Sequence, residues 1–175
     1  SSSPVDSPIK AGFTSLKSDR ITLPQANVGE RYIVAIVAKF APVTPAGWTL
    51  THACTPSVTN MFCSVYDRVV QASDPGAVRI FGSTTNAHIM LWVYRNVSSV
   101  SASNNHSTTG TTILPPNAAV AHSFGEAIRV GMSKGTTAIT LVPPVDLQTI
   151  STDYAVSSHG SDNANLQFTT GTRTF

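Results

Sequence analysis

The chain has 175 residues, of which 41% are hydrophobic and 11% are charged, and its net charge is +2. This length allows one domain with a proper hydrophobic core, and so weak and scattered a positive charge does not steer a protein to nucleic acid or anionic lipid. The longest apolar stretch, residues 32–38, is about a third of the roughly 20 residues that span a membrane, so we expect no membrane insertion.

The first half of the chain is dominated by strand patterns. Residues 31–40, RYIVAIVAKF, and 87–95, AHIMLWVYR, are apolar at both odd and even positions, which suits central strands covered on both faces. Residues 60–70 alternate and predict a third long strand, and shorter strands are expected at 48–52 and 77–82. Proline and glycine mark the turns between them.

The second half gives weaker signals of the same kind. A long polar loop is expected at residues 96–110 and a second polar loop at 157–163. Short strands are expected at residues 111–114, 126–132, 138–142, 147–156 and 166–170. Strands spaced about 8 to 15 residues apart with turn residues between them are typical of a sandwich or barrel.

The expected fold is therefore all-β, a two-sheet antiparallel sandwich that is jelly-roll-like. A loose internal repeat, Ile21–Pro24 and Ile113–Pro116, places a leucine-proline step before a strand in each half, as two facing Greek keys would. We expect a single domain at residues 11–175 after a flexible lead-in at residues 1–10.

The two cysteines, Cys54 and Cys63, become cross-strand neighbours if the segments around them pair as a hairpin. The favoured interpretation is two half-buried free thiols. A structural zinc site needs four ligands, and although His52 lies two residues before Cys54, no fourth ligand has suitable spacing. The sequence leaves the redox compartment open.

Residues 31–97 carry a resemblance to a known family. An apolar strand runs into the turn Pro45-Ala46-Gly47-Trp48-Thr49, SVYDRVV and an Asp74-Pro75 step follow, and LWVYRNV closes the run. This order resembles β-sandwich modules of phage tail and tail-fibre proteins and of related phage-derived bacterial proteins. In those modules a P-x-G-W-T turn, a Y-R strand and a strand ending near Y-R-N/G-V follow an apolar strand. The resemblance implies a virion-associated or surface-displayed module, and it implies no enzyme.

The titratable residues give little support for catalysis. Glu30 and Glu126 lie beside expected strands, where a solvent-facing charge or an edge charge is the simpler interpretation. A glycosidase needs two carboxylates about 5 to 10 Å apart, and the nearest candidate pair is Asp67 with Asp74. Asp74 is interpreted as a turn residue before proline.

Two other catalytic and metal-binding patterns are missing from the sequence. The chain has no G-x-S-x-G motif, and its five histidines are isolated, without the spacing of a shared metal site. We expect no catalytic residue, no metal and no cofactor.

Ligand binding is expected at aromatic and loop residues. Low charge with abundant Asn, Ser and Thr suits a neutral glycan, and binding residues of sandwiches usually lie on loops. Trp48 is either an exposed sugar-stacking ring or, as we favour, a core residue closing one end of the sandwich. Asp162 alone is a poor calcium site, since calcium takes six or more oxygens. The candidate ligand-binding residues follow the turn at 43–47 or lie in the loops at 98–110 and 157–165. They are Trp48, Asn104, Asn105, His106, His159, Asp162 and Asn163.

The expected function is a non-enzymatic virion module of a tailed phage, from a tail fibre, minor tail protein or receptor-binding protein. Its expected partners are other virion proteins and a host-surface glycan, and its expected place is the virion, assembled in the host cytoplasm. Apolar residues at both parities of the two strongest strands suggest a homo-oligomer, with a trimer as the first candidate. Two alternatives remain open, namely a capsid decoration or head-fibre protein, and a carbohydrate-binding module or glycan-cleaving enzyme.

Overall fold

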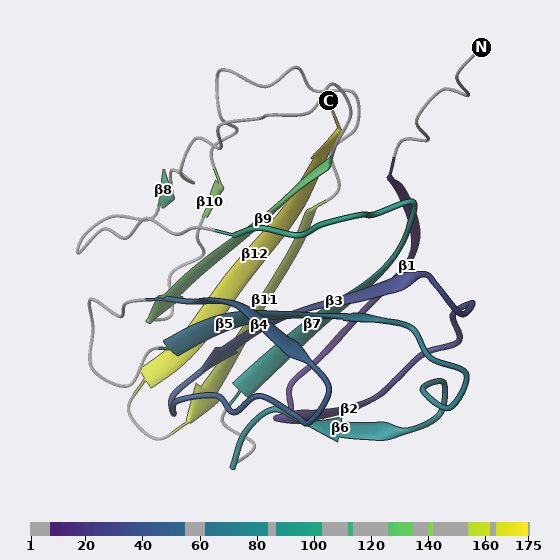
Figure 1. Cartoon of the computed structure of the whole chain (residues 1–175). Helices are drawn as coiled ribbons and strands as arrows, with labels where there is room; N and C mark the ends of the chain where they lie inside the picture. Colours follow the sequence, from purple (N-terminus) through teal and green to yellow (C-terminus); the bar gives the residue numbers. More distant parts are fainter. Residues whose placement is uncertain are drawn as a thin grey trace.

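The computed structural model describes residues 8–54, 62–83 and 87–102 with their side chains, and five later strands by their backbone. The described part is all-β and contains no helix (Figure 1). Its strands are β1 (Ile9–Leu16), β2 (Arg20–Thr22), β3 (Arg31–Ala38), β4 (Thr49–Ala53), β5 (Phe62–Val69), β6 (Val78–Ile80), β7 (Ala87–Arg95), β8 (Thr112–Ile113), β9 (Glu126–Lys134), β10 (Thr140–Leu141), β11 (Tyr154–Ser161) and β12 (Ala164–Thr174).

The largest sheet has the strand order β1-β7-β3-β5-β4, and every neighbouring pair in it is antiparallel. Strand β3 is central, so that Val34 lies between Tyr66 of β5 and Leu91 of β7. The expectation of a central strand at residue 31 onward is confirmed, and so is the strand at residues 87–95. Hydrogen bonds on both edges of β3 explain why its β-branched run is stable there.

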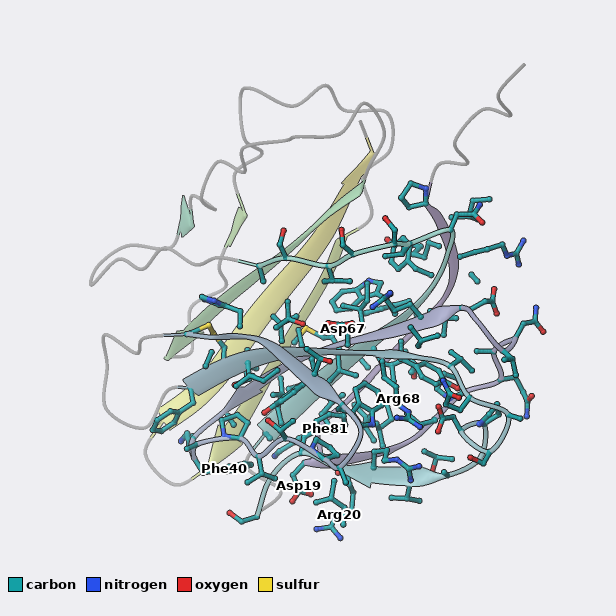
Figure 2. All side chains as sticks on the ribbon, in the orientation of Figure 1. Asp19, Arg20, Phe40, Asp67, Arg68 and Phe81 are labelled. Atoms are coloured by element: carbon teal, nitrogen blue, oxygen red, sulfur yellow. A yellow bond between two sulfur atoms is a disulfide. The ribbon has the colours of Figure 1, made fainter. Side chains whose placement is uncertain are left out.

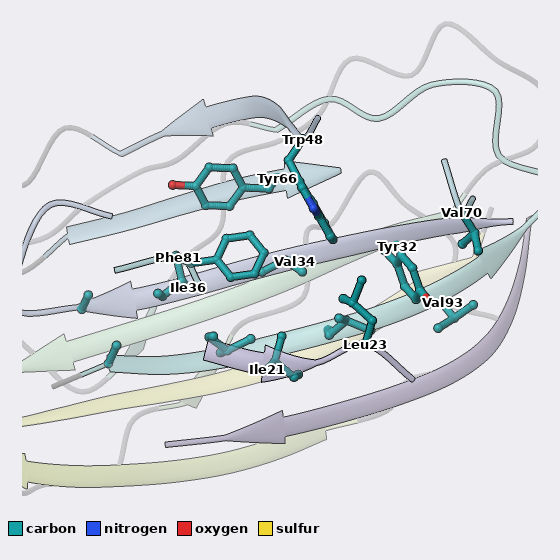
Figure 3. Packing of buried hydrophobic residues seen from close by; sticks show 14 residues of the cluster. Ile21, Leu23, Tyr32, Val34, Ile36, Trp48, Tyr66, Val70, Phe81 and Val93 are labelled. Atoms are coloured by element: carbon teal, nitrogen blue, oxygen red, sulfur yellow. The ribbon is translucent and has the colours of Figure 1, made fainter. Parts of the chain in front are cut away.

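Both faces of this sheet are covered by apolar side chains, as two separate clusters. Alternate residues of a strand point to opposite faces, and β3 therefore supplies Val34 to one cluster and Ile33 to the other. The first cluster is the larger (Figure 3). Its members are Ile21, Leu23, Tyr32, Val34, Ile36, Ala38, Trp48, Tyr66, Val70, Phe81, Ala87, Ile89, Leu91 and Val93. The second contains Ile33, Ala35, Val37, Met90, Trp92 and Tyr94.

A two-stranded antiparallel ribbon of β2 and β6 covers the first cluster. Ile21 points inward and is 4% exposed, whereas Ile80, on the partner strand, is 44% exposed. The pairing continues past β2, since Leu23 N donates to Ala77 O (2.8 Å) and Gly76 N donates to Leu23 O (2.9 Å). Each apolar side chain fully buried in this way stabilises the fold by about 1.5–3 kcal/mol.

The C-terminal strands form two further groups. Strands β11, β12 and β9 make a three-stranded antiparallel sheet with β12 in the middle, and β8 and β10 make a short parallel pair. The β11–β12 hairpin pairs Tyr154 with Gly171 at one end and Ser161 with Ala164 at the other. The hairpin contradicts the expected polar loop at residues 157–163, because residues 157–161 belong to β11.

Two N-terminal strands were not expected. Strand β1 begins at Ile9, so the last two residues of the expected lead-in belong to the sheet, while residues 1–7 lie outside the described part. Its sequence IKAGFTSL lacks a clean period of two, and its place at the sheet edge next to β7 decides its conformation. Strand β2 is three residues long, too short for a periodicity signal.

Candidate functional site

Each carboxylate in the side-chain-described part of the chain forms an ion pair with arginine. The pairs are Asp19 with Arg20, Glu30 with Arg95, Asp67 with Arg31, and Asp74 with both Arg68 and Arg79. Asp19 and Asp74 are fully buried, and Glu30 and Asp67 are 8% and 7% exposed. A buried carboxylate needs a partner to stay charged. The primary role of these ion pairs is therefore to offset the free-energy cost of burying the charges.

Arg68 of β5 is the centre of the most connected group. Its Nε and Nη2 donate to the two carboxylate oxygens of Asp74 (2.9 and 3.2 Å), and its Nη1 donates to Gly47 O (2.9 Å). Asp74 also accepts from Gln71 N (2.8 Å), and Arg79 Nη2 lies 3.6 Å from its Oδ1. We call these five residues the Arg68 network. It ties the turn before β4 to the turn between β5 and β6.

Charge and hydrogen bonding control the ionisation of Asp74. Burial by itself raises the pKa of this carboxyl, but the hydrogen bonds from Arg68 and Gln71 N and the charges of Arg68 and Arg79 outweigh burial and hold the pKa below 3.8. Asp74 is therefore an anion at neutral pH, as a bidentate partner of arginine requires. The neighbouring Tyr32 phenol, which donates to Pro24 O (2.7 Å), has its pKa raised to about 12, chiefly by burial and then by the charges of Asp74 and Glu30.

Trp48 follows Gly47 directly and is a core residue, 6% exposed. Its ring stacks on Tyr32 (centroids 6.1 Å apart) and meets Phe81 edge-on (5.2 Å). Both contacts lie inside the first cluster (Figure 3). This position agrees with the interpretation of Trp48 as a core residue and leaves its ring no open face on which a sugar could stack.

Asp67 lies on the other face of the sheet from the Arg68 network. Consecutive residues of a strand point to opposite faces, and Asp67 and Arg68 do so (Figure 2). Arg31 Nη1 donates to Asp67 Oδ1 and Thr51 Oγ1 donates to Asp67 Oδ2, both at 2.5 Å. Asp67 and Asp74 therefore do not converge on one cleft as the two carboxylates of a glycosidase must.

Glu30 joins the start of β3 to the end of β7. Its Oε2 accepts from Arg95 Nε (3.2 Å), and its Oε1 accepts from Asn27 N (2.5 Å). Immediately after Arg95, Asn96 has a φ of 63°, in the left-handed region that glycine and asparagine tolerate best. This backbone conformation gives a physical reason for asparagine or glycine at that point of the Y-R-N/G-V pattern.

The residues that carry the sequence resemblance thus hold one scaffold together. Gly47, Trp48, Arg68 and Asp74 meet around the first cluster, and Arg95 anchors β7 to Glu30. The Arg68–Asp74 pair was not predicted from the sequence. The sequence shows only an arginine six residues before an Asp-Pro-Gly turn. Because the pair forms only when this turn folds back on β5, the spacing alone does not predict it.

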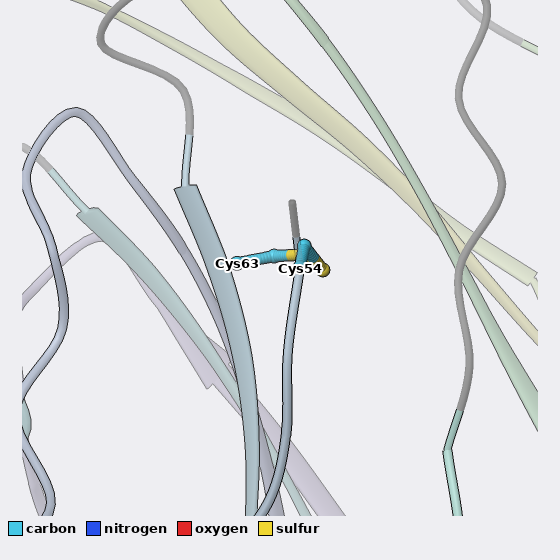
Figure 4. The surroundings of a disulfide bond; sticks show 2 residues. All are labelled: Cys54 and Cys63. Carbon is cyan, nitrogen blue, oxygen red and sulfur yellow. A yellow bond between two sulfur atoms is a disulfide. The ribbon is translucent and has the colours of Figure 1, made fainter. Parts of the chain in front are cut away.

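Cys54 and Cys63 form a disulfide bond (Figure 4). Their Cα atoms are 5.2 Å apart, and Cys54 N donates to Cys63 O (2.9 Å). The interpretation as free thiols was therefore wrong, because the antiparallel pairing of β4 with β5 brings the two side chains to bonding distance. No group of potential metal ligands occurs among the residues with described side chains.

The remaining candidate ligand-binding residues are placed only in part. His159 lies in β11, opposite Leu166 of β12, and not in a loop. Asn104, Asn105, His106, Asp162 and Asn163 lie outside the described residues. At the start of the expected 98–110 loop, Ser98 O accepts a long hydrogen bond from Arg31 Nη2 (3.5 Å).

Within the ranges described, no helix has the length and hydrophobicity of a transmembrane segment. Comparison of this chain with protein-family models, curated proteins and solved structures finds no match.

Proposed function

We propose that this chain is a non-enzymatic module of a tailed-phage virion, of the tail-fibre or minor-tail type, that attaches the particle to a host surface through a glycan. One observation carries the proposal. The residues that resemble phage tail modules are joined in a single set of contacts around Arg68, Trp48 and Asp74. Residues with this role stabilise the fold. We therefore expect the host ligand to be bound by the loops at the rim of the sheets.

The proposed architecture is a jelly-roll-like sandwich. The second face of the large sheet carries Met90 and Trp92, which are 0% and 2% exposed and so need a covering layer. Strand β12 contacts β3, which makes the β11-β12-β9 sheet the candidate second layer. Two facing antiparallel sheets would explain why β3 and β7 carry apolar side chains at both odd and even positions.

Recognition is favoured over acid–base catalysis by the state of the described carboxylates. A general acid or base must exchange a proton near neutral pH, and a carboxylate bonded to a guanidinium favours its charged form. Asp74 has two arginine partners, which lower its pKa, and Asp67 lies on the opposite face of the sheet, so the two do not form an acid–base pair.

Self-association is part of the proposal, with a homotrimer as the expected form. Its support is the exposed apolar side chains on edge strand β1 and on the β2–β6 ribbon. On β1, Ile9 and Leu16 are 47% and 37% exposed, and on β6, Val78 is 52% exposed. A module with such strips buries them against other virion proteins or against copies of itself.

The test is a binding assay with purified full-length protein. Fluorescent protein is incubated with host cells, with the extracted surface polysaccharide as competitor, and an Asn104→Ala/His106→Ala variant is compared with wild type. We expect saturable binding that the polysaccharide competes and the variant weakens at least tenfold. The matched control is Val28→Ser, an exposed residue before β3 that has no part in the proposed binding or self-association, which should bind as wild type does.

Three outcomes would contradict the proposal. Co-sedimentation with empty capsids and no cell binding would favour a capsid decoration protein. Shortening of the polysaccharide, abolished by Asp67→Asn or Asp74→Asn, would favour a glycan-cleaving enzyme. Immunogold labelling of a parent particle anywhere except its tail would remove the tail assignment.

A further inference from the structure

Strand β4 is the shortest strand of the large sheet. It lies at the edge, so β5 is its one neighbour in the sheet order. Its five residues are all exposed or half-buried, and its pairing with β5 shifts register between Leu50 and His52. Edge strands with few buried contacts open at low free energy.

The two ends of β4 are secured in different ways. At its start, Trp48 is packed in the first cluster and Gly47 O accepts from Arg68. In its middle, Thr51 donates to Asp67. At its far end, Cys54 N donates to Cys63 O, and the disulfide joins the same two residues. The disulfide therefore adds a covalent attachment at that end.

Backbone pairing alone is enough to position the two cysteines. Their Cα separation of 5.2 Å lies within the usual range for a disulfide, and it follows from the register of β4 with β5. The thiols can therefore reach this geometry before the bond exists. Both residues are partly exposed, so a small thiol or disulfide can reach them.

We propose that Cys54 and Cys63 form an oxidation-dependent clamp, in which the sheet folds with both thiols reduced and the bond then fixes β4 once the protein meets an oxidising environment. The timing rests on the proposed function, because a virion protein folds in a reducing cytoplasm and acts outside the cell. The clamp would stiffen the edge of the sheet for its work at the host surface.

The oxidant is a low-molecular-weight disulfide such as oxidised glutathione. One cysteine thiolate attacks it, forms a mixed disulfide and releases one glutathione thiolate. The second cysteine thiolate attacks the protein sulfur of the mixed disulfide and releases the other glutathione. The two cysteine sulfurs together lose two electrons, which the glutathione disulfide gains, and the two protons of the thiols pass to the released glutathione.

The experiment compares oxidised and reduced full-length protein. Reductant should leave the protein folded at room temperature and lower its Tm by about 5–10 °C, the entropy effect expected for a crosslink of nine-residue separation in a domain of this size. Amide exchange should accelerate more at Leu50 to Ala53 than in β3 and β7, where exchange should rise only by the loss of global stability. The Cys54→Ser/Cys63→Ser variant should have the Tm and amide exchange of the reduced wild type, and adding reductant should change neither.

Several results would overturn the clamp. Global unfolding on reduction would mean that the protein needs the disulfide in order to fold. An unchanged Tm would mean that the disulfide does not stabilise the protein. Equally faster amide exchange in all strands would mean that the disulfide does not act locally on β4. Alkylation followed by mass measurement adds a direct readout: two labels are expected in reduced glutathione and none after oxidised glutathione. A bond that persists in reduced glutathione contradicts the proposal. None of these measurements involves host binding, so they stand apart from the test of the proposed function.

Discussion

Gly47 combines an unusual backbone conformation with a close charged neighbour. Its φ is 81°, and a Cβ added there would lie 2.6 Å from Arg68 Nη1. The end of an arginine side chain normally moves aside, but this one is fixed by Asp74 on one side and Gly47 O on the other. Glycine at position 47 therefore permits both the turn before β4 and the close approach of Arg68 to the backbone at that turn.

We expect Gly47→Ala to destabilise the protein by about 2–4 kcal/mol, from backbone strain plus a displaced charged hydrogen bond. Gly29→Ala is the matched control, since Gly29 has a φ of 91° and nothing within 4 Å of an added Cβ. It should lose about 1–2 kcal/mol from backbone strain alone. Urea unfolding measures both, and equal losses would show that Arg68 is not fixed as described.

Asp74→Asn keeps the shape of the side chain and removes the charge that balances Arg68 and Arg79. We expect a loss of about 3 kcal/mol at neutral pH, because the guanidinium of Arg68, which is 20% exposed, keeps its charge without a countercharge. Urea unfolding at pH 7 checks the size of the loss, and an unchanged free energy of unfolding would mean that the pair contributes nothing.

The same variant has a pH signature. The pKa of Asp74 is lowered in the folded protein from 3.8, so its contribution is fully present above that value and is lost as pH falls through the folded-state pKa. The difference in unfolding free energy between wild type and Asp74→Asn should therefore be constant between about pH 5 and pH 8 and shrink in more acidic solution. If the difference in unfolding free energy instead grew as the pH fell, the pKa of Asp74 would be raised in the folded protein and not lowered.

At the scale of elements, the β2–β6 ribbon shows how two short strands complete the core. Ile21 and Arg79 face each other across the ribbon and both point inward, Ile21 to the first cluster and Arg79 to Asp74. The other face carries Val78 and Ile80, which are exposed. The ribbon is thus amphipathic, although neither strand is long enough for its sequence to show it.

Two isoleucines on this ribbon provide a matched comparison. We expect Ile21→Ala to cost about 2–5 kcal/mol, because it opens a cavity in the first cluster. Ile80→Ala on the outer face should cost about 1 kcal/mol or less, since much of that side chain remains in water. Thermal or urea unfolding distinguishes them, and similar losses would mean that the ribbon does not cover the cluster through its Ile21 face.

At the scale of the whole molecule, two-sided burial of β3 and β7 is achieved within one chain. Tyr32 and Ile36 are fully buried on one face, and Met90 is fully buried on the other. The apolar character of these strands, which first suggested an oligomer, is thus already explained by the monomer. Self-association must instead rest on the apolar side chains that remain exposed, such as Ile9 and Val78.

Light scattering on the purified protein tests this part of the proposal. A trimer has three times the mass of the 18.4 kDa chain, and we expect a concentration-independent trimer held by apolar contact. Replacing Ile9 and Leu16 by serine should shift the population toward monomer without lowering Tm by more than a few degrees. A monomer at every concentration would remove self-association and leave host attachment to be tested alone.

The sequence by itself determined the all-β class, the central strand from Arg31 and the strand from Ala87 to Arg95, because a run of apolar and β-branched residues is a local property. The pairing partners are not local. The tertiary structure decided which carboxylate meets which arginine and that Cys54 bonds Cys63, because both depend on the register of β5 with β4 and on a turn that folds back. Residues 157–161, the polar part of β11, likewise form a strand through their pairing with β12, which their own sequence does not reveal.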